Sequence, residues 1–166
     1  RIVSEHGWAD LVGPTVCRTL TPDEVAVVRG KLGPDPLNAD ADPGQFYRAA
    51  AKSSRPIGVI LMDQAAISGV GNIFRAESLY RQKIDPLRPG KTLSDDELRR
   101  LWDDNKHLLT IGVRVGRIIT TEQQDRPGIP ETEAWPDHAN YVYMRHGQKC
   151  PRCSATIRME EIAGRK

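Results

Sequence analysis

A Gly-x-Gly-Asn turn in the middle of the chain limits the fold more than any other stretch. It consists of Gly69, Val70, Gly71 and Asn72, with an apolar run before it and apolar residues at helical spacing after it. Glycine tolerates positive φ angles and lets another backbone approach closely. The pattern therefore predicts two helices joined by a tight turn, and the second helix begins at Asn72. We expect each glycine either to adopt a positive φ or to allow a close backbone approach.

The start of that second helix is a candidate anion site. The first N–H groups of a helix have no partner within the helix, and the helix dipole favours negative charge there. Asn72 adds an amide that suits a phosphate oxygen but carries little base information. Arg75, Arg81 and Lys83 follow and predict a positive end for the helical hairpin. A helix corner without a ligand would have the same four turn residues, so both interpretations stay open on this evidence.

Start signals predict a chain of helices between residues 21 and 119. Each helix begins at a polar capping residue or at a proline that suits the first turn, and these starts are Thr21, Asp42, Pro56, Asn72 and Ser94. We expect the first helix to bury Val25, Val28 and Leu32. We expect the third to run from residue 57 to 64, and the longest, which opens on a Ser94–Glu97 capping box, to fade between 112 and 116.

The remaining segments complete a mainly α fold, organised around a helical bundle. Residues 1–18, with a Gly13-Pro14 breaker, are interpreted as a remnant of an N-terminal β domain and a linker, and 19–119 as the helical domain. Residues 120–140 contain three prolines and predict a long polar loop. Residues 141–166 predict a small β-hairpin, with strands at 141–143 and 156–159. We expect both ends to be cut from a longer protein.

Composition excludes some classes of protein. Hydrophobic residues make up 39% of the chain, but no apolar run is long enough to span a bilayer and no signal peptide is visible. Net charge is only +2, yet residues 71–91 carry five basic and two acidic side chains, and residues 141–166 carry six and two. The stretch between them is acidic. Two basic segments placed side by side would form a phosphate-binding face, although chance clustering on a solvated surface gives the same distribution.

Three cysteines point to a reducing compartment rather than to a disulfide framework. Cys17 stands alone, whereas Cys150 and Cys153 form a Cys-x-x-Cys turn. Two thiolates in such a turn are half of a tetrahedral zinc site. Three alternatives stay open: a truncated zinc ribbon, a site completed by His138 or His146, and free thiols.

Three ordered motifs carry a resemblance to a known family. Residues 61–64, 69–73 and 76–79 resemble the helix–two-turn–helix signature of the formamidopyrimidine-DNA glycosylase/endonuclease VIII family. Residues 32–37 resemble the segment that opens the second domain of that family, and residues 141–165 resemble its C-terminal zinc finger. These motifs are similar to those of the actinobacterial endonuclease VIII-like branch of the family.

The resemblance implies roles for individual residues. Asn72 and the Gly71 amide would hold a phosphate next to a damaged nucleotide, and Arg165 would grip phosphates of the same strand. Glu77 would face the active site and support the catalytic N-terminus, the alternative being a solvated helix glutamate. Cys150 and Cys153 would be the first two zinc ligands, so zinc would be the cofactor of the parent protein with an incomplete site here.

The catalytic groups of the family are not in this sequence. Its chemistry uses an N-terminal proline that attacks the sugar C1′, a neighbouring glutamate, and a lysine of the N-terminal β domain. Arg1 is not a proline, and Glu5 does not stand in the right place. The resemblance therefore implies the DNA-binding part of a bifunctional DNA glycosylase/AP lyase of base excision repair acting on oxidised bases, with no catalytic residue in this chain and no activity by itself.

The expected partner is double-stranded DNA with a damaged base or an abasic site, bound by a monomer in the bacterial cytoplasm near the nucleoid, with no membrane involved. The alternative is a non-catalytic DNA-binding module that recognises damage or abasic sites. A third hypothesis gives the same helical hairpin an RNA partner, and the Cys-x-x-Cys turn that follows argues against it.

Overall fold

The computed structural model describes residues 1–10 and 16–165 and is mainly helical, as predicted. The chain divides between Lys31 and Leu32 into two compact units, and each is described by itself. The Gly13-Pro14 breaker lies outside the described residues. Among the helices in the described ranges, none combines the length and the apolar character that crossing a bilayer requires.

The first unit contains a β-hairpin. Strand β1 (Ile2–Ser4) pairs antiparallel with β2 (Gly7–Ala9), and Val3 lies opposite Trp8. Every residue of both strands is exposed, so within this unit the hairpin covers no core. Short strands at this end agree with the sequence pattern, while their origin in a larger β domain stays a prediction.

Helix α1 (Pro22–Arg29) also belongs to the first unit. Thr21 caps it as expected: its hydroxyl accepts from the Glu24 amide, and the Glu24 carboxylate accepts from the Thr21 amide. The predicted burial is wrong, because no residue of α1 is buried and Val28 is 41% exposed. Leu32 lies beyond the helix and is 45% exposed. Local capping signals thus define the helix start, but its apolar residues find no core within the unit.

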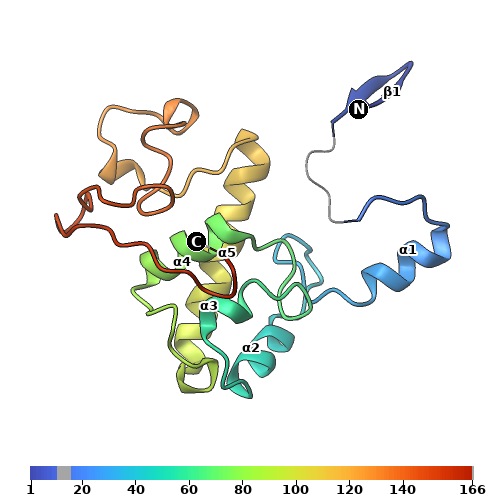
Figure 1. The fold of residues 1–166 in the computed structure, drawn as a ribbon, viewed down its shortest axis with the longest axis horizontal. Coiled ribbons are helices and arrows are strands. Elements are labelled where there is room, and N and C mark those ends of the chain that lie inside the picture. Colours follow the sequence, from blue (N-terminus) through green and yellow to red (C-terminus); the bar gives the residue numbers. More distant parts are fainter. Residues whose placement is uncertain (11–15, 166) are drawn as a thin grey trace. The chain divides into compact units, whose positions relative to one another are not determined.

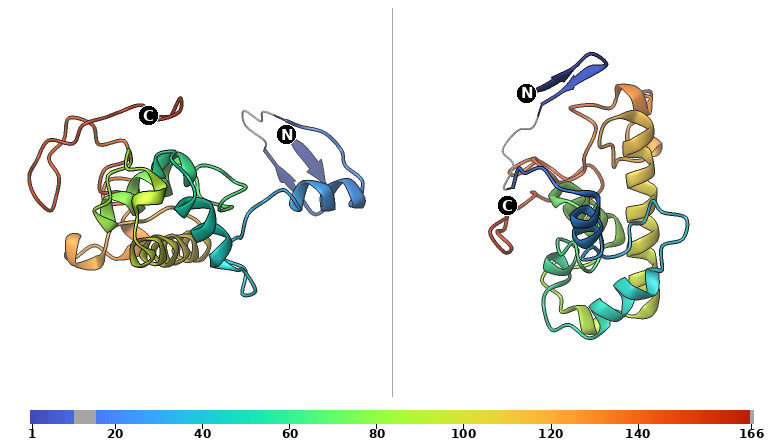
Figure 2. Two further views of the ribbon diagram at one scale, coloured as in Figure 1. Left: turned by 90° about the horizontal axis from the view of Figure 1, so that it is seen from below. Right: turned by 90° about the vertical axis from the view of Figure 1, so that its right-hand side faces the viewer.

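The second unit is a helical bundle built on one long helix (Figures 1 and 2). Helix α5 (Asp95–Val115) packs against α2 (Pro43–Ala51) and α4 (Asn72–Gln82), and α4 also contacts the short α3 (Ile57–Ile60). A 3₁₀ turn, η1 (Gly90–Thr92), contacts α2. The core consists of buried apolar side chains from all of these helices, among them Phe46, Ile57, Ile60, Phe74, Leu79, Leu98, Leu101 and Leu108.

The boundaries of α2 and α5 follow the predicted capping signals. Asp42 accepts a hydrogen bond from the Gly44 amide at 2.8 Å at the start of α2. The Ser94–Glu97 capping box opens α5, and Gly116 ends it with a φ of 69°. A residue in this left-handed conformation is a common helix terminator, and glycine adopts it without strain.

Helix α3 is shorter than predicted. It ends at Ile60 rather than near residue 64, since the Asp63 carboxylate accepts from the Ala65 amide at 3.1 Å and folds the chain into a turn. The Gln64 carbonyl accepts from the Gly33 amide at 2.8 Å. Gly33 packs so closely that an added Cβ would lie 2.6 Å from the Ala65 carbonyl oxygen. Residues 61–71 therefore form a loop of successive turns that is hydrogen-bonded to the chain before α2.

Residues 117–140 are irregular, as the polar sequence predicts, but they have a small core of their own. The 3₁₀ turns η2 (Gln123–Asp125) and η3 (Glu131–Glu133) lie here. Apolar side chains of this segment pack against the end of α5, and the cluster comprises Ile111, Ile119, Ala134 and Ala139.

The predicted strands at 141–143 and 156–159 are wrong. The backbone N–H groups of residues 141–143 bind a side chain of α4 instead of a neighbouring strand. Residues 147–157 do fold back on themselves around the Cys-x-x-Cys turn, but only one isolated bridge, between Lys149 and Thr156, forms there. A second bridge joins Ile162 to Arg165. The C-terminal hairpin is thus present in an irregular form.

Candidate nucleic-acid interface

The loop before α4 is closed by one side chain. The Gln64 amide nitrogen donates to the Val70 carbonyl at 2.8 Å, and its oxygen accepts from the Gly69 amide at 2.9 Å. The Ser68 amide donates to the Pro34 carbonyl at 3.1 Å, which ties the loop to the segment before α2. Gln64 therefore fixes the direction in which the chain enters α4.

The two glycines of the turn have different roles. Gly69 has a φ of 84°, the left-handed conformation that the sequence predicts. Gly71 has a φ of −110° and a ψ of −175°, so the expected alternative of a positive φ at this residue is wrong. A Cβ added at Gly71 would meet nothing within 4 Å. Neither backbone strain nor packing inside the described protein requires glycine at this residue, which leaves space for a partner's backbone to approach.

Gly71 is the N-cap of α4, and Asn72 is its first residue. The first amide bonded within the helix is that of Arg75, which donates to the Gly71 carbonyl at 2.9 Å. The Ile73 and Phe74 amides of the preceding turn therefore point out of the helix end. The candidate anion site is thus formed where the sequence predicts it.

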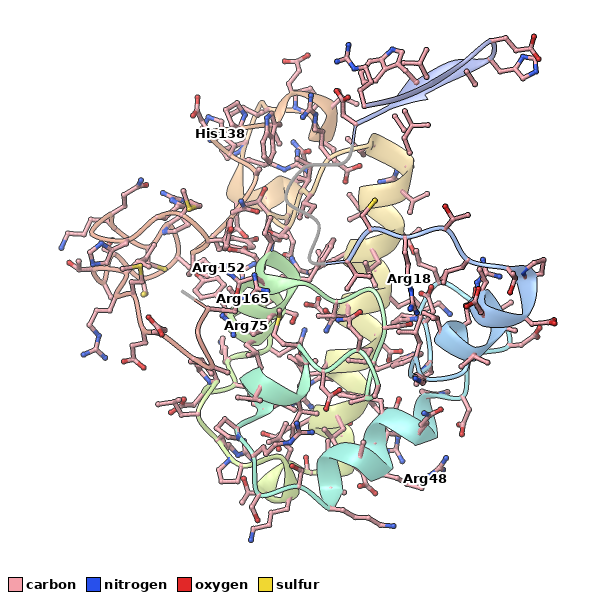
Figure 3. All side chains as sticks on the ribbon, turned by 45° about the vertical axis from the view of Figure 1, so that its right-hand side comes forward. Arg18, Arg48, Arg75, His138, Arg152 and Arg165 are labelled. Atoms are coloured by element: carbon pink, nitrogen blue, oxygen red, sulfur yellow. The ribbon has the colours of Figure 1, made fainter. Side chains whose placement is uncertain are left out.

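A groove of about 950 Å³ runs along the outer side of α4. Residues 142–162 form its opposite wall. The groove brings Asn72 and Arg75 together with Cys150 and Cys153, and its lining also includes Tyr80 and Ile162. Arg165, in the tight turn that follows, is exposed and lies beside Arg75 (Figure 3).

The arginines of α4 are not the exposed positive end that the sequence suggests. Arg75 is only 5% exposed. The Arg81 side chain is 9% exposed, and it pairs with Asp104 of α5 at 2.9 Å and donates to the Thr120 carbonyl at 2.7 Å. Burial raises the pKa of Asp104, although Arg81 opposes that shift. Arg81 is therefore used to join α4, α5 and the following segment, and Lys83 is the exposed cation among these residues.

Glu77 is fully buried, so the alternative of a solvated helix glutamate is wrong. One carboxylate oxygen accepts from the Thr120 hydroxyl at 2.6 Å and the Tyr141 amide at 2.8 Å. The other accepts from the Val142 and Tyr143 amides at 2.8 and 2.7 Å. A buried charge is stable only when hydrogen bonds of this kind compensate it. Glu77 thus anchors the start of the C-terminal segment on α4, and its role beside a catalytic N-terminus stays a prediction.

The Cys-x-x-Cys turn packs against α4 through Tyr80. The Tyr80 hydroxyl lies 3.1 Å from Cys150 Sγ, and Cys150 is buried whereas Cys153 is exposed. Burial raises the pKa of Cys150, but hydrogen bonds from Tyr80, the Cys153 and Arg152 amides and the Cys153 thiol outweigh it, and the pKa falls to about 7. The turn is therefore arranged to hold sulfur as thiolate, the form that binds metal.

These two sulfurs do not make a complete metal site by themselves. Within residues 1–10 and 16–165, no group of three or more His, Cys, Asp or Glu side chains is placed to hold a metal ion. Neither His138 nor His146 forms such a group with the two cysteines in the described chain, and a zinc site stays a prediction.

Sequence reasoning missed the role of Arg152, which lies between the two cysteines. It donates to Asp125 at 2.7 Å and to the Tyr141 hydroxyl at 2.9 Å, and its guanidinium lies 4.4 Å from the centre of the Tyr141 ring. Tyr141 is fully buried and stacks on Tyr80 with ring centroids 5.1 Å apart. Tyr141 is thus a core residue. No local signal connects Arg152 with Asp125, because the partners are 27 residues apart.

Comparisons with known proteins agree with this geometry. Residues 32–124 match the family described as the formamidopyrimidine-DNA glycosylase H2TH domain. Endonuclease 8 1 of Mycobacterium bovis is 43% identical over 166 residues, or 99% of this chain and 61% of that protein. The formamidopyrimidine-DNA glycosylase of Thermus thermophilus is 38% identical over 141 residues, or 81% of this chain and 50% of that protein. The chain thus spans roughly half to three-fifths of these relatives.

Solved structures show the same likeness. The complex of Lactococcus lactis Fpg with DNA containing an abasic site matches 88% of this chain and 53% of its own, with a TM-score of 0.69 and 27% identity. MutM (Fpg) from Thermus thermophilus matches 86% of this chain and 53% of its own, with a TM-score of 0.66 and 29% identity. The resemblance stated from the sequence is confirmed, and this chain belongs to the formamidopyrimidine-DNA glycosylase H2TH domain family.

Proposed function

We propose that this chain is the DNA-binding part of a bifunctional DNA glycosylase/AP lyase that acts on oxidised bases in base excision repair. Membership of the H2TH family supports the proposal, as do relatives named as DNA glycosylases and a structural neighbour bound to DNA with an abasic site. The partner is double-stranded DNA with a damaged base or an abasic site, bound by a monomer. Such a substrate places the protein in the bacterial cytoplasm.

The observation that carries the proposal is the backbone at the N-terminus of α4. Gly71 has no side chain, and among the described residues no atom lies within 4 Å of the position its Cβ would take, directly before Asn72. A phosphate fits there because helix amides and the helix dipole favour an anion. Contacts of this kind fix the orientation of DNA without reading its sequence.

The other residues are proposed to support this grip. Arg165 neutralises phosphates of the same strand. Cys150 and Cys153 supply two of four zinc ligands in the parent protein, and the zinc would hold the hairpin that carries Arg165. Glu77 acts indirectly, since both of its oxygens already bind residues 120 and 141–143.

In this proposal, the chemistry lies outside the 166 residues. The parent protein flips the damaged base out of the stack. A secondary amine then attacks C1′, displaces the base and forms a Schiff base, after which elimination cuts the strand. No residue of this chain carries a covalent step, so the chain alone binds DNA and does not excise bases.

A trapping experiment tests this division of labour. Sodium borohydride reduces a Schiff base to a stable covalent complex with abasic-site DNA. We expect a trapped complex with the full-length protein and none with the 166-residue chain, while both bind the same duplex in fluorescence anisotropy. Trapping by the 166-residue chain would contradict the proposal.

The trapping experiment and a salt titration together separate the proposal from its two alternatives. A non-catalytic DNA-binding module would bind abasic-site duplex, but the full-length protein would give no trapped complex. An RNA-binding protein would prefer structured RNA over duplex DNA at every salt concentration. For each nucleic acid, the slope of log K against log salt counts the phosphates that are neutralised.

A further inference from the structure

Arg75 is a buried cation without an acidic partner among the described residues. It is 5% exposed, and its Nη1 donates a 3.5 Å hydrogen bond to the Ile162 carbonyl. Asp85 and Glu160 line the same groove, but neither forms an ion pair with Arg75 within the described residues. Buried arginines are ordinarily paired, as the Arg81 side chain, six residues further along α4, is with Asp104. Arg75 therefore differs from the other buried arginine of α4.

A second cation adds to the charge at this place. Arg165 lies beside Arg75 (Figure 3), on the turn that is closed by backbone hydrogen bonds between Ile162 and Arg165 at 2.9 and 3.1 Å. Burial lowers the pKa of Arg75, and the charge of Arg165 lowers it further. Two like charges held together, one of them out of water, raise the free energy of the unliganded protein. A bound anion would remove that cost.

The helix directs Arg75 to the open end of α4. Residues three apart lie one above the other on a helix surface, so Arg75 and Asn72 share a face. Both line the groove beside α4. Asn72 and Arg75 thus lie on the same side of α4 as the groove, and Arg165 lies beside Arg75.

We propose that Arg75 is a phosphate ligand that acts together with Asn72 and Arg165, so that one DNA phosphate is held between a buried and an exposed guanidinium at the N-terminus of α4. This role of Arg75 rests on the proposed function. It adds to that function a buried guanidinium, Arg75, which positions the exposed guanidinium of Arg165. Arginine suits this role because its planar fork binds a phosphate through two parallel hydrogen bonds.

The test is a salt titration by fluorescence anisotropy, with a fluorescein-labelled duplex that contains a tetrahydrofuran abasic-site analogue. We compare the 166-residue chain with its Arg75→Gln and Arg75→Lys variants and, as a matched charge control, with Lys91→Gln, an exposed lysine outside the groove. Arg75→Gln is expected to weaken binding about tenfold and to reduce the salt slope by about 1. Arg75→Lys keeps the slope and loses severalfold in affinity.

The outcomes separate the two proposals. If the wild-type chain shows no binding to the duplex, the proposed function fails. If the wild-type chain binds and Arg75→Gln keeps the wild-type salt slope, Arg75 is not a phosphate ligand although the function stands.

Thermal melts in phosphate and in chloride at equal ionic strength give a second measurement. Phosphate should raise the wild-type Tm more than that of Arg75→Lys, and equal shifts contradict the proposal even if Arg75→Gln does not fold.

Discussion

Arg152 and Asp125 connect the Cys-x-x-Cys turn to the segment that follows α5. The Arg152 guanidinium donates to the Asp125 carboxylate from Nε at 3.1 Å and from Nη2 at 2.7 Å. The Tyr141 hydroxyl donates to the same carboxylate, and Arg152 lies over its ring. The pKa of Asp125 is lowered, first of all by its hydrogen bond with Arg152. The stability of the Cys-x-x-Cys turn is thus coupled to the stability of residues 122–126.

Asp125→Asn and Arg152→Gln are each expected to lower the free energy of unfolding by about 1–2 kcal/mol, since a charged hydrogen-bonded pair with a ring contact is lost. In a double-mutant cycle measured by urea unfolding, the double variant should lose less than the sum of the two. Hydrogen exchange should rise in both 122–126 and 147–157 in either variant. Exchange that rises only around the mutated residue would contradict the coupling, and Lys106→Gln, at an exposed residue of α5, is the control.

Glu77 offers the sharpest stability test, because its buried carboxylate accepts from four donors. Glu77→Gln turns one acceptor into an N–H group that faces backbone N–H groups. We expect a loss of about 3 kcal/mol or more in urea unfolding and faster hydrogen exchange at residues 141–143. Glu133→Gln, at an exposed residue of η3, should change stability by less than about 0.5 kcal/mol. Equal effects of the two variants would mean that Glu77 does not anchor the C-terminal segment.

The sequence was informative where the cause of structure is local. The capping residues Thr21, Asp42 and Ser94 identify helix starts because each binds backbone amides within three residues. The positive φ of Gly69 and the start of α4 at Asn72 are local features of the same kind, although the Gln64 side chain closes the loop between them. The resemblance to the glycosylase family adds the prediction that the anion at this turn is a DNA phosphate, whereas geometry alone leaves the anion unspecified.

Long-range pairing explains what the sequence did not predict. The strands expected at 141–143 have suitable residues, but Glu77, 64 to 66 positions earlier, takes their backbone amides. Arg75 and Arg81 look equivalent in a basic stretch, yet Asp104 pairs with only one of them. Periodicity in α1 predicts a buried face, and burial depends on a partner surface that the first unit does not supply.

Acid should weaken the fold partly through Glu97. Arg88 donates to this carboxylate at 2.6 and 2.9 Å, and that hydrogen bond, followed by one from the Ser94 amide, lowers the pKa of Glu97 from 4.5 to about 2. A carboxylate with a lowered pKa in the folded state stabilises fully above its unfolded pKa, and its contribution disappears as pH falls towards the folded pKa.

Glu97→Gln keeps the capping side chain but cannot titrate. Its free energy of unfolding should therefore fall less than that of the wild type between about pH 6 and about pH 3, as measured by urea unfolding. Wild-type and variant curves that stay parallel over this range would show that the Arg88–Glu97 pair contributes no pH dependence.

Gly71→Ala separates the binding role of the turn from its folding role. The φ of −110° and ψ of −175° suit alanine, and its Cβ would meet no atom of the described residues within 4 Å, so the Tm should stay within a few degrees of the wild type. A methyl group at this place obstructs a phosphate that approaches the α4 amides, so affinity for abasic-site duplex should fall about tenfold or more.

Gly112→Ala is the control, since a Cβ in α5 would lie 3.7 Å from Phe74 Cζ, an ordinary contact. It should keep wild-type affinity and gain up to about 1 kcal/mol of stability. Wild-type DNA affinity in Gly71→Ala would mean that no phosphate approaches this backbone, and the open N-terminus of α4 would lose its assignment.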